Sequence, residues 1–234
     1  MSYIPGVDLS SVQGNVDFEK VAAAGYRFAI LKCGDGNDGI DPFFVKNLAG
    51  CRANGITPGA YQFLFPIGLA SDAAHSNRAP EEQAKYHFAA SRGLGCSAGE
   101  IRTFMDCEWP SKPEDWVTYA CNRNQIRDWL LRYKTQYDSE SGASTGIYTD
   151  KYWWLDQIGG DQFEGLLSAA FWSADPQATS ALPADGTSPF LYAPFTSWSI
   201  WQHTDRLVVP GIVDLVDGDC IPDEATFTAL TTRP

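Results

Sequence analysis

Phe104-Met105-Asp106-Cys107-Glu108-Trp109 carries the strongest structural signal in this chain. The stretch ends a mostly apolar run that begins at residue 101, and such a short run predicts a buried β-strand. Side chains alternate between the two faces of a strand, so Asp106 and Glu108 are expected on one face and Cys107 on the other. The stretch therefore predicts a core strand whose end holds two carboxylates side by side.

The segments on both sides of this strand alternate between strand-like and helix-like patterns. The predicted strands cover residues 6–10, 26–33, 57–65, 101–108, 144–149, 168–174, 197–203 and 213–217. The predicted helices cover residues 17–24, 42–54, 80–92 and 114–137. Such alternation predicts an α/β fold in which parallel strands are joined by right-handed crossovers, and this number of strands favours a closed TIM-like barrel. No linker or repeat interrupts the alternation, so we expect a single domain over residues 1–234.

Composition and charge exclude several classes of partner. The chain has 234 residues, of which 44% are hydrophobic, as is ordinary for a globular protein with a large core. Its formal net charge of −12 opposes binding to nucleic-acid phosphates and to anionic membrane surfaces. No apolar run reaches the length of a membrane span, and the first residues lack the basic and apolar regions of a signal peptide. We expect a protein that is made soluble in the cytoplasm, unless a leader was removed.

The cysteines and histidines do not form a recognisable metal site. The six cysteines are scattered without a C-x-x-C pair, at positions 33, 51, 96, 107, 121 and 220. His75, His87 and His203 are too dispersed to bind zinc together or to activate a nucleophile. We expect no metal, no cofactor and mostly free, buried thiols, with one or two disulfides as the alternative if the protein works outside the cell.

Acidic residues stand at three of the predicted strand ends. Asp8 ends the first strand, Asp106 and Glu108 end the fourth, and Asp217 ends the eighth. Active sites of such barrels collect at the carboxyl ends of the strands, and the first and eighth strands of a closed barrel are neighbours. The four acids are therefore predicted to converge on one catalytic site. Two neighbouring carboxylates do not both ionise easily, so one can donate a proton while the other stays charged, as glycoside hydrolysis requires.

Aromatic and polar side chains stand at the other strand ends, and we expect substrate-binding residues among them. They are Lys32, Tyr61, Phe63, Tyr148, Trp172, Asp175, Trp201 and Gln202. Flat aromatic rings suit the faces of sugars, so Tyr61, Tyr148 and Trp172 are predicted to contact a saccharide. For Phe63 and Trp201 the favoured alternative is packing in the barrel core.

These segments together resemble the lysozymes of glycoside hydrolase family 25, the muramidases of fungi, streptomycetes and many phages. The matching segments follow the family's order over essentially the whole chain, at residues 6–10, 13–14, 28–32, 41–43, 47, 55–61, 82–84, 105–108, 146–149, 171–174, 201–204, 211–212 and 216–217. Gln62 and His203 depart from the pattern, which usually has His and Tyr there. Asp214, Asp217 and Asp219 all lie in the last segment, so the choice of Asp217 depends on the resemblance.

The resemblance implies that residues 1–234 form one catalytic barrel of modified (β/α)5(β)3 type. It also implies cleavage of the β-1,4 bond between N-acetylmuramic acid and N-acetylglucosamine in bacterial peptidoglycan. Glu108 is predicted to be the general acid/base, because Trp109 and the second carboxylate raise its pKa, and Asp106 is predicted to stay ionised. An Asp and a Glu on one strand favour substrate-assisted hydrolysis with retention, in which Asp106 orients the 2-acetamido group. Asp8 or Asp217 could instead position a water for inversion.

Two competing functions have different sequence signatures. A non-catalytic cell-wall carbohydrate-binding or phage-structural barrel would lack Asp106 or Glu108, and both are present. A chitinase-like hydrolase would carry a longer D-x-x-D-x-D-x-E run, which is missing. We expect a monomer that acts on the cell wall. It would be made without a signal peptide, like a phage endolysin released at lysis, or secreted with a leader that this sequence does not include.

Overall fold

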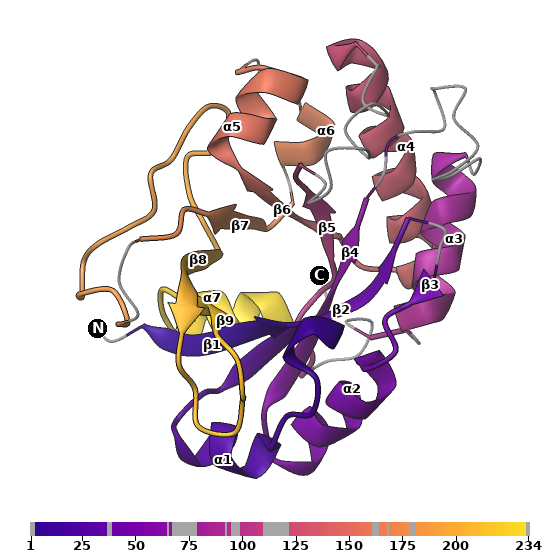
Figure 1. The fold of residues 1–234 in the computed structure, drawn as a ribbon. Coiled ribbons are helices and arrows are strands. Elements are labelled where there is room, and N and C mark those ends of the chain that lie inside the picture. Colours follow the sequence, from indigo (N-terminus) through magenta and orange to yellow (C-terminus); the bar gives the residue numbers. More distant parts are fainter. Residues whose placement is uncertain are drawn as a thin grey trace.

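The computed structural model describes residues 3–36, 39–64, 66, 79–91, 93–94, 99–109, 122–160, 164–167, 169–177 and 181–232. Within these residues, eight strands close into a barrel (Figure 1). They are β1 (Ile4–Leu9), β2 (Phe28–Asp35), β4 (Thr57–Phe63), β5 (Phe104–Cys107), β6 (Gly146–Asp150), β7 (Phe171–Ala174), β8 (Ile200–Leu207) and β9 (Val216–Ile221). The pairing of β1 with β2 closes the ring, and the short β3 (Gly39–Ile40) lies beside the end of β2. The predicted α/β barrel is confirmed.

Helices cover the outside of the first half of the barrel. They are α1 (Phe18–Ala23), α2 (Phe44–Ala53), α3 (Pro80–Ser91) and α4 (Arg123–Ser141), whereas the 3-10 turn η1 (Ser11–Gln13) follows β1 and buries no residue. The start of the helix predicted from residue 114 lies outside the described residues. In the described part of the second half, α5 (Lys151–Trp153), the π-helical turn η3 (Trp154–Ile158) and α6 (Glu164–Leu167) are short, and no helix joins β7, β8 and β9. This loss of helices is the modified (β/α)5(β)3 pattern.

The last strand runs against its neighbours, so the prediction of parallel strands throughout is wrong for β9. All pairings from β1 to β8 around the barrel are parallel, whereas β9 is antiparallel to both β8 and β1. The short connection from β8 to β9 allows only an antiparallel pair. The strand predicted at residues 213–217 is in fact Val216–Ile221. Asp217 is therefore the second residue of its strand, and the reversed direction still places it at the end of the barrel where Asp8 lies.

Strand β5 has the predicted alternation. Met105 and Cys107 point outward into a buried cluster with Trp129 and Tyr133 of α4. Phe104 points into the barrel, where its ring centroid lies 5.5 Å from that of Trp172. Asp106, two residues after Phe104, is 3% exposed and lies on the same inner face. The period of two at this strand thus fixes which side chains pack against the outer helices and which face the inside of the barrel.

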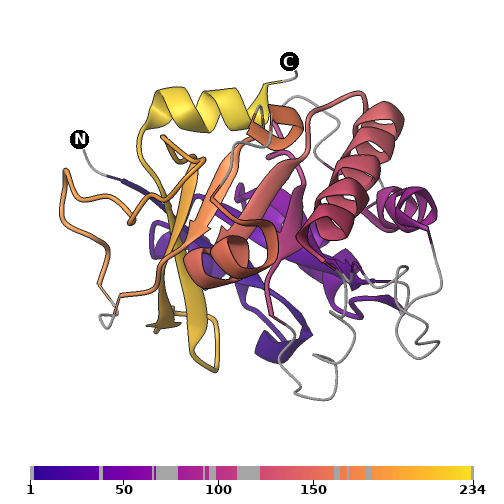
Figure 2. The same ribbon diagram turned by 90° about the horizontal axis from the view of Figure 1, so that it is seen from above.

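The end of the barrel opposite the mouth is closed by α7 (Glu224–Thr231), which was not predicted from the sequence (Figure 2). The carboxylate of Asp223 caps the helix by accepting the Thr226 amide at 2.7 Å. The Phe227 ring centroid lies 6.5 Å from that of Phe28 inside the barrel. This helix is short and has one fully buried residue, Leu230, so its apolar pattern is weak.

Four cysteines, at positions 33, 51, 107 and 220, are free and buried, which confirms the expectation for these thiols. Cys96, Cys121 and His75 lie outside the described residues. His203 is fully buried on β8, and burial lowers its pKa to about 4. In the described part of the chain, no helix combines the length and the apolar character needed to cross a membrane.

Close packing inside the barrel gives a stability test at Gly146. A Cβ on Gly146 would lie 2.4 Å from Phe104 Cε1 and 2.9 Å from the Ala170 carbonyl oxygen. Gly146→Ala should therefore lower the free energy of unfolding by about 1–3 kcal/mol. Gly160→Ala is the matched control, because its Cβ would meet nothing closer than 3.8 Å. It should change stability by less than about 0.5 kcal/mol. Urea unfolding followed by circular dichroism measures both, and equal stabilities would contradict this packing.

Candidate active site

Eight side chains line a cavity of about 60 Å³ at the mouth of the barrel, here called the mouth cavity. They are Asp8, Tyr61, Asp106, Glu108, Tyr148, Trp172, Gln202 and Asp217. The structure thus brings together all four acids that were predicted to be catalytic. It also places Tyr61, Tyr148, Trp172 and Gln202 beside them, each from a different strand.

Hydrogen bonds hold the walls of the mouth cavity in place. The Tyr148 hydroxyl donates to Gln202 Oε1 at 3.0 Å, and Gln202 Nε2 donates to Asp8 Oδ2 at 2.9 Å. Asp8 also stands directly opposite Asp217 in the antiparallel pair of β1 and β9. Gln202 therefore links an aromatic wall to the acid pair at the junction of the first and last strands.

Trp172 forms the floor of the mouth cavity. It is 1% exposed, and its ring centroid lies 4.5 Å from that of Tyr148 and 6.0 Å from that of Tyr61. Its Nε1 donates to Asp219 Oδ1 at 2.9 Å. Because this polar edge is already bonded below the cavity, Trp172 presents only ring atoms to a ligand.

The three acids near the last strand occupy different positions. Asp217 lines the mouth cavity, whereas Asp214 is exposed in the turn before β9. Asp219 is fully buried one step deeper on the face of β9 that Asp217 shares. Burial, followed by repulsion from Asp8 and Asp217, raises the pKa of Asp219 well above its usual value. Asp217 is therefore the cavity acid of this strand, and Asp219 is a buried acid that sequence reasoning did not choose.

Burial raises the pKa of both acids at the end of β5. For Glu108 the pKa rises to about 7, because of burial first and then repulsion from Asp150 and Asp217. Lys32 and a hydrogen bond with Tyr148 oppose this rise. For Asp106 burial and then repulsion from Glu108 raise the pKa well above its usual value, against the attraction of Lys32.

Two expectations concern this pair. Asp106 was expected to stay ionised, and this stays a prediction; burial, which is deeper for Asp106 than for Glu108, raises its pKa. Trp109 and the second carboxylate were expected to raise the pKa of Glu108; burial is the first cause of this rise, and the charges that add to it are those of Asp150 and Asp217. The two carboxyls are best treated as a pair that shares protons.

Four predicted substrate-binding residues lie outside the mouth cavity. Lys32 Nζ lies 2.7 Å from Asp35 Oδ1 and 5.4 Å from the centroid of the Phe63 ring, so these two predicted residues contact each other. Trp201 packs with Tyr3 and Cys220 on the outer side of the barrel wall. It neighbours the inward-facing Gln202 and therefore points the other way, so it packs in a cluster outside the barrel and not in the barrel core, which was the favoured alternative. The fourth, Asp175, lines a separate pocket.

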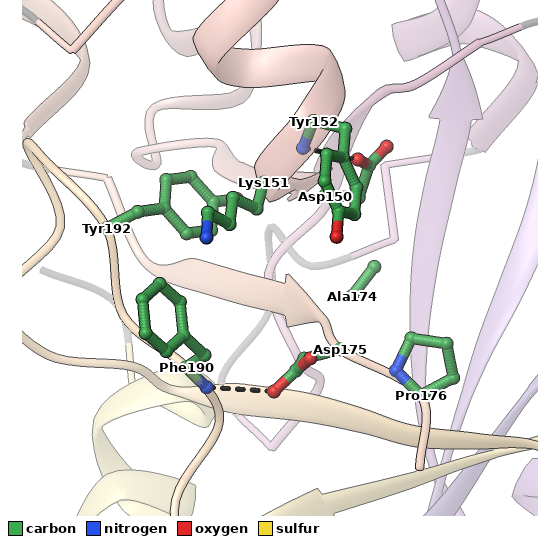
Figure 3. Close-up of a pocket in the computed structure, with 8 residues that line it drawn as sticks. All are labelled: Asp150, Lys151, Tyr152, Ala174, Asp175, Pro176, Phe190 and Tyr192. Atoms are coloured by element: carbon green, nitrogen blue, oxygen red, sulfur yellow. Dashed lines mark hydrogen bonds between the residues drawn. The ribbon is translucent and has the colours of Figure 1, made fainter. Parts of the chain in front are cut away.

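This larger pocket, here called the rim pocket, has a volume of about 470 Å³ (Figure 3). It is lined by Asp150, Lys151, Tyr152, Ala174, Asp175, Pro176, Phe190 and Tyr192. Sequence reasoning found only Asp175 among these residues. One sequence feature could have indicated this pocket. Asp150 is an acid that directly follows the predicted strand 144–149, and it ends β6 in the structure.

Comparisons with known proteins agree with this fold and site. Residues 7–212 match the model of the glycosyl hydrolases family 25. Lysozyme M1 of Streptomyces globisporus is 27% identical over 217 residues, covering 92% of this chain and 67% of that protein. N,O-diacetylmuramidase of Chalaropsis is 27% identical over 221 residues, covering 92% and 94%. The crystal structure of a bacterial lysozyme from Streptomyces coelicolor superposes with a TM-score of 0.82 at 25% identity, covering 99% and 98%.

Several carboxylates that meet at the end of an α/β barrel are the groups that glycoside hydrolysis requires. The family match also covers most of the chain. The chain belongs to glycosyl hydrolases family 25. This membership confirms the resemblance seen in the sequence.

The raised pKa of Asp217 predicts a cost in stability at neutral pH. Burial, followed by repulsion from Asp205, raises this pKa from 3.8 to about 6. The stability linked to this proton is fully present below about pH 3.8 and is lost as the pH rises through about 6. Asp217→Asn should therefore be about 1–3 kcal/mol more stable than wild type at pH 7.5, and the gain should nearly vanish at pH 4.

Urea unfolding at the two pH values measures this difference. Asp214→Asn is the matched control, because Asp214 is exposed in the turn before the same strand. It should change stability by less than about 0.5 kcal/mol at both pH values. A gain for Asp217→Asn that is equal at both pH values would refute the assignment.

Proposed function

We propose that this protein cleaves the β-1,4 bond between N-acetylmuramic acid and N-acetylglucosamine in bacterial peptidoglycan, as a single catalytic unit. Family membership and relatives named lysozyme and N,O-diacetylmuramidase support hydrolysis of this polymer. The observation that carries the proposal is Glu108, whose pKa is raised to about 7 at the end of β5, inside a cavity with three further acids. The presence of both acids of the pair disfavours a non-catalytic binding barrel.

Glu108 is the general acid in this proposal. A carboxyl with a pKa of about 7 is substantially protonated near neutral pH, so it can donate its proton to the glycosidic oxygen as the bond breaks. The same residue, once ionised, can take a proton from the water that completes the hydrolysis.

Asp106 orients the substrate in this proposal. Its Oδ1 is buried, and no hydrogen-bond partner for it lies among the described residues. A buried acceptor of this kind suits the N–H of a 2-acetamido group. Once this N–H is held, the acetamido carbonyl oxygen can attack the anomeric carbon, so that hydrolysis proceeds with retention. Asp8 and Asp217 then set the charge of the cavity. Inversion by a water held on one of them is the alternative, and the configuration of the first product distinguishes the two.

Replacement of Glu108 tests the general acid. Glu108→Gln keeps the shape of the side chain but cannot donate a carboxylic proton, so the rate should fall by roughly 10²–10⁴-fold while the fold is kept. Glu140→Gln, an exposed substitution on α4, is the control and should retain wild-type activity. The assay digests peptidoglycan and chitin in parallel and identifies the new reducing ends by mass. Near wild-type lysis by Glu108→Gln would exclude this role, and reducing ends without muramic acid would exclude a muramidase.

The pH dependence of the rate tests the acid pair. Activity requires one proton on the pair, so it should fall on the alkaline side near pH 7, as Glu108 ionises. On the acid side, the rate should fall at a pH above the usual pKa range of aspartate, because burial and repulsion from Glu108 raise the pKa of Asp106. A bell-shaped profile with its optimum on the acid side of neutrality is expected. Initial rates on a soluble glycan between about pH 3 and 9 cover the reference carboxyl values and these shifts.

A single substitution should move one limb of this profile. Asp150 repels Glu108 and so raises its pKa, and Asp150→Asn removes that charge. Asparagine can also cap the short helix α5, as Asp150 does. The alkaline limb of Asp150→Asn should therefore move to lower pH. A rate that keeps rising into alkaline pH in the wild type would contradict a protonated Glu108.

A further inference from the structure

The rim pocket lies one step farther along the same strands that supply the mouth cavity. Tyr148 of β6 and Trp172 of β7 line the mouth cavity, and Asp150 and Ala174, two residues later on each strand, line the rim pocket. Residues two apart share a face and lie about 6.6 Å apart along a strand. Asp150 is also close enough to Glu108 to repel it. A group bound in the rim pocket is therefore within reach of a sugar held in the mouth cavity.

Lys151 is the one cation among the described residues that line the two cavities. Its Nζ lies 4.1 Å from the centroid of the Phe190 ring, and no carboxylate of the described residues lies within ion-pair distance of it. An ammonium held over an aromatic face is fixed in place but keeps its hydrogen-bond donors available. The rim pocket thus offers a positioned cation to a ligand.

The two carboxylates of the rim pocket are engaged with the backbone. Asp150 Oδ1 accepts the amides of Tyr152 and Trp153 at 2.7 and 3.0 Å. Asp175 Oδ2 accepts the amide of Phe190 at 2.8 Å. Figure 3 shows the Lys151 ammonium on the side of the pocket near Phe190 and Tyr192, with Asp150 on the opposite side. The cation and Asp150 therefore lie on different sides of the pocket, whereas Asp175 lies beside Phe190.

The apolar surface beside this cation is exposed and suits an organic substituent. Phe190 is 59% exposed and Tyr152 is 77% exposed. Large exposed rings next to a fixed ammonium bind groups that combine a carboxylate with alkyl or amide parts. In peptidoglycan, such groups hang from the muramic acid residue, as its lactyl ether or as the peptide attached to it. N-acetylglucosamine polymers have no such group.

We propose that the rim pocket binds a carboxylate-bearing substituent of the glycan, and that Lys151 selects glycans that carry it. This inference rests on the proposed function, because it takes the reacting sugar to lie in the mouth cavity. The lactyl group and the attached peptide share the carboxylate chemistry, and the substrates of the test separate them.

The test measures kcat/KM on two soluble glycans of equal length, one with peptides and one with free lactyl groups. Each is used as prepared and after methyl esterification of its carboxylates. Wild type should prefer the charged form of at least one glycan over its ester. Lys151→Gln should reduce this charged-to-ester ratio by about three- to thirtyfold, the range for a partly exposed bond between charged groups. Lys151→Arg should keep most of the preference, because it keeps the charge.

Lys46→Gln is the matched control, since Lys46 also lies over a phenylalanine, with Nζ 5.9 Å from the Phe43 centroid, but lines neither cavity. Its ratio should equal that of wild type. A loss confined to the free lactyl glycan assigns the pocket to that group, and a loss confined to the other glycan assigns it to the peptide. Unchanged ratios for Lys151→Gln on both glycans would overturn the inference. Failure of wild type to cleave any of the glycans would instead overturn the proposed function.

Discussion

Two carboxylates buried close together cannot both ionise without a large cost, and the mouth of this barrel gathers Asp8, Asp106, Glu108, Asp217 and Asp219. Burial is the first cause of the raised pKa of each of them, and for all but Asp217, whose further repulsion comes from Asp205, repulsion within the group adds to it. The group must therefore hold protons that separate carboxylates would release. A site that stores protons near neutral pH is what proton donation to a glycosidic oxygen needs. The folded barrel keeps these acids close together despite the unfavourable free energy, because its eight strands fix their positions.

The polar groups around the acids keep this arrangement ordered. Gln202 joins Tyr148 to Asp8, and Trp172 joins the aromatic floor to Asp219. Each of these bonds joins two strands that have one other strand between them in the barrel. Lys32 of β2 attracts both Asp106 and Glu108. The acids are thus held by bonds from different strands, so the geometry of the site depends on closure of the whole barrel.

The sequence predicted those features that depend on local periodicity. The inner position of Asp106 and the outer position of Cys107 follow from alternation along one strand, and both were correct. The direction of the strand that carries Asp217 was predicted wrongly, because it is set by the connection after β8 and by pairing with β1. Trp201 was assigned beside Gln202 without regard to the face on which each residue lies.

The rim pocket was missed for a different reason. Phe190 and Tyr192 come from the long connection between β7 and β8, which has no regular pattern to read. Only the folded backbone brings them next to Lys151. Helix α7 was missed because it is short and its apolar face is small. Local patterns therefore identified the acids and most of the barrel, whereas the loops that surround the mouth required the three-dimensional structure.

The pairing of the first strand with the last has a consequence for biosynthesis. Asp8 accepts a hydrogen bond from Gln202, which is 194 residues later in the chain, and it stands opposite Asp217. Contacts between residues so distant in sequence form late, after the intervening chain has folded. A ribosome that is still translating the barrel therefore carries a site without its full set of acids. The mouth cavity gains Asp217 only when β9 is inserted, so the wall-cleaving activity proposed for the protein would appear at the end of folding.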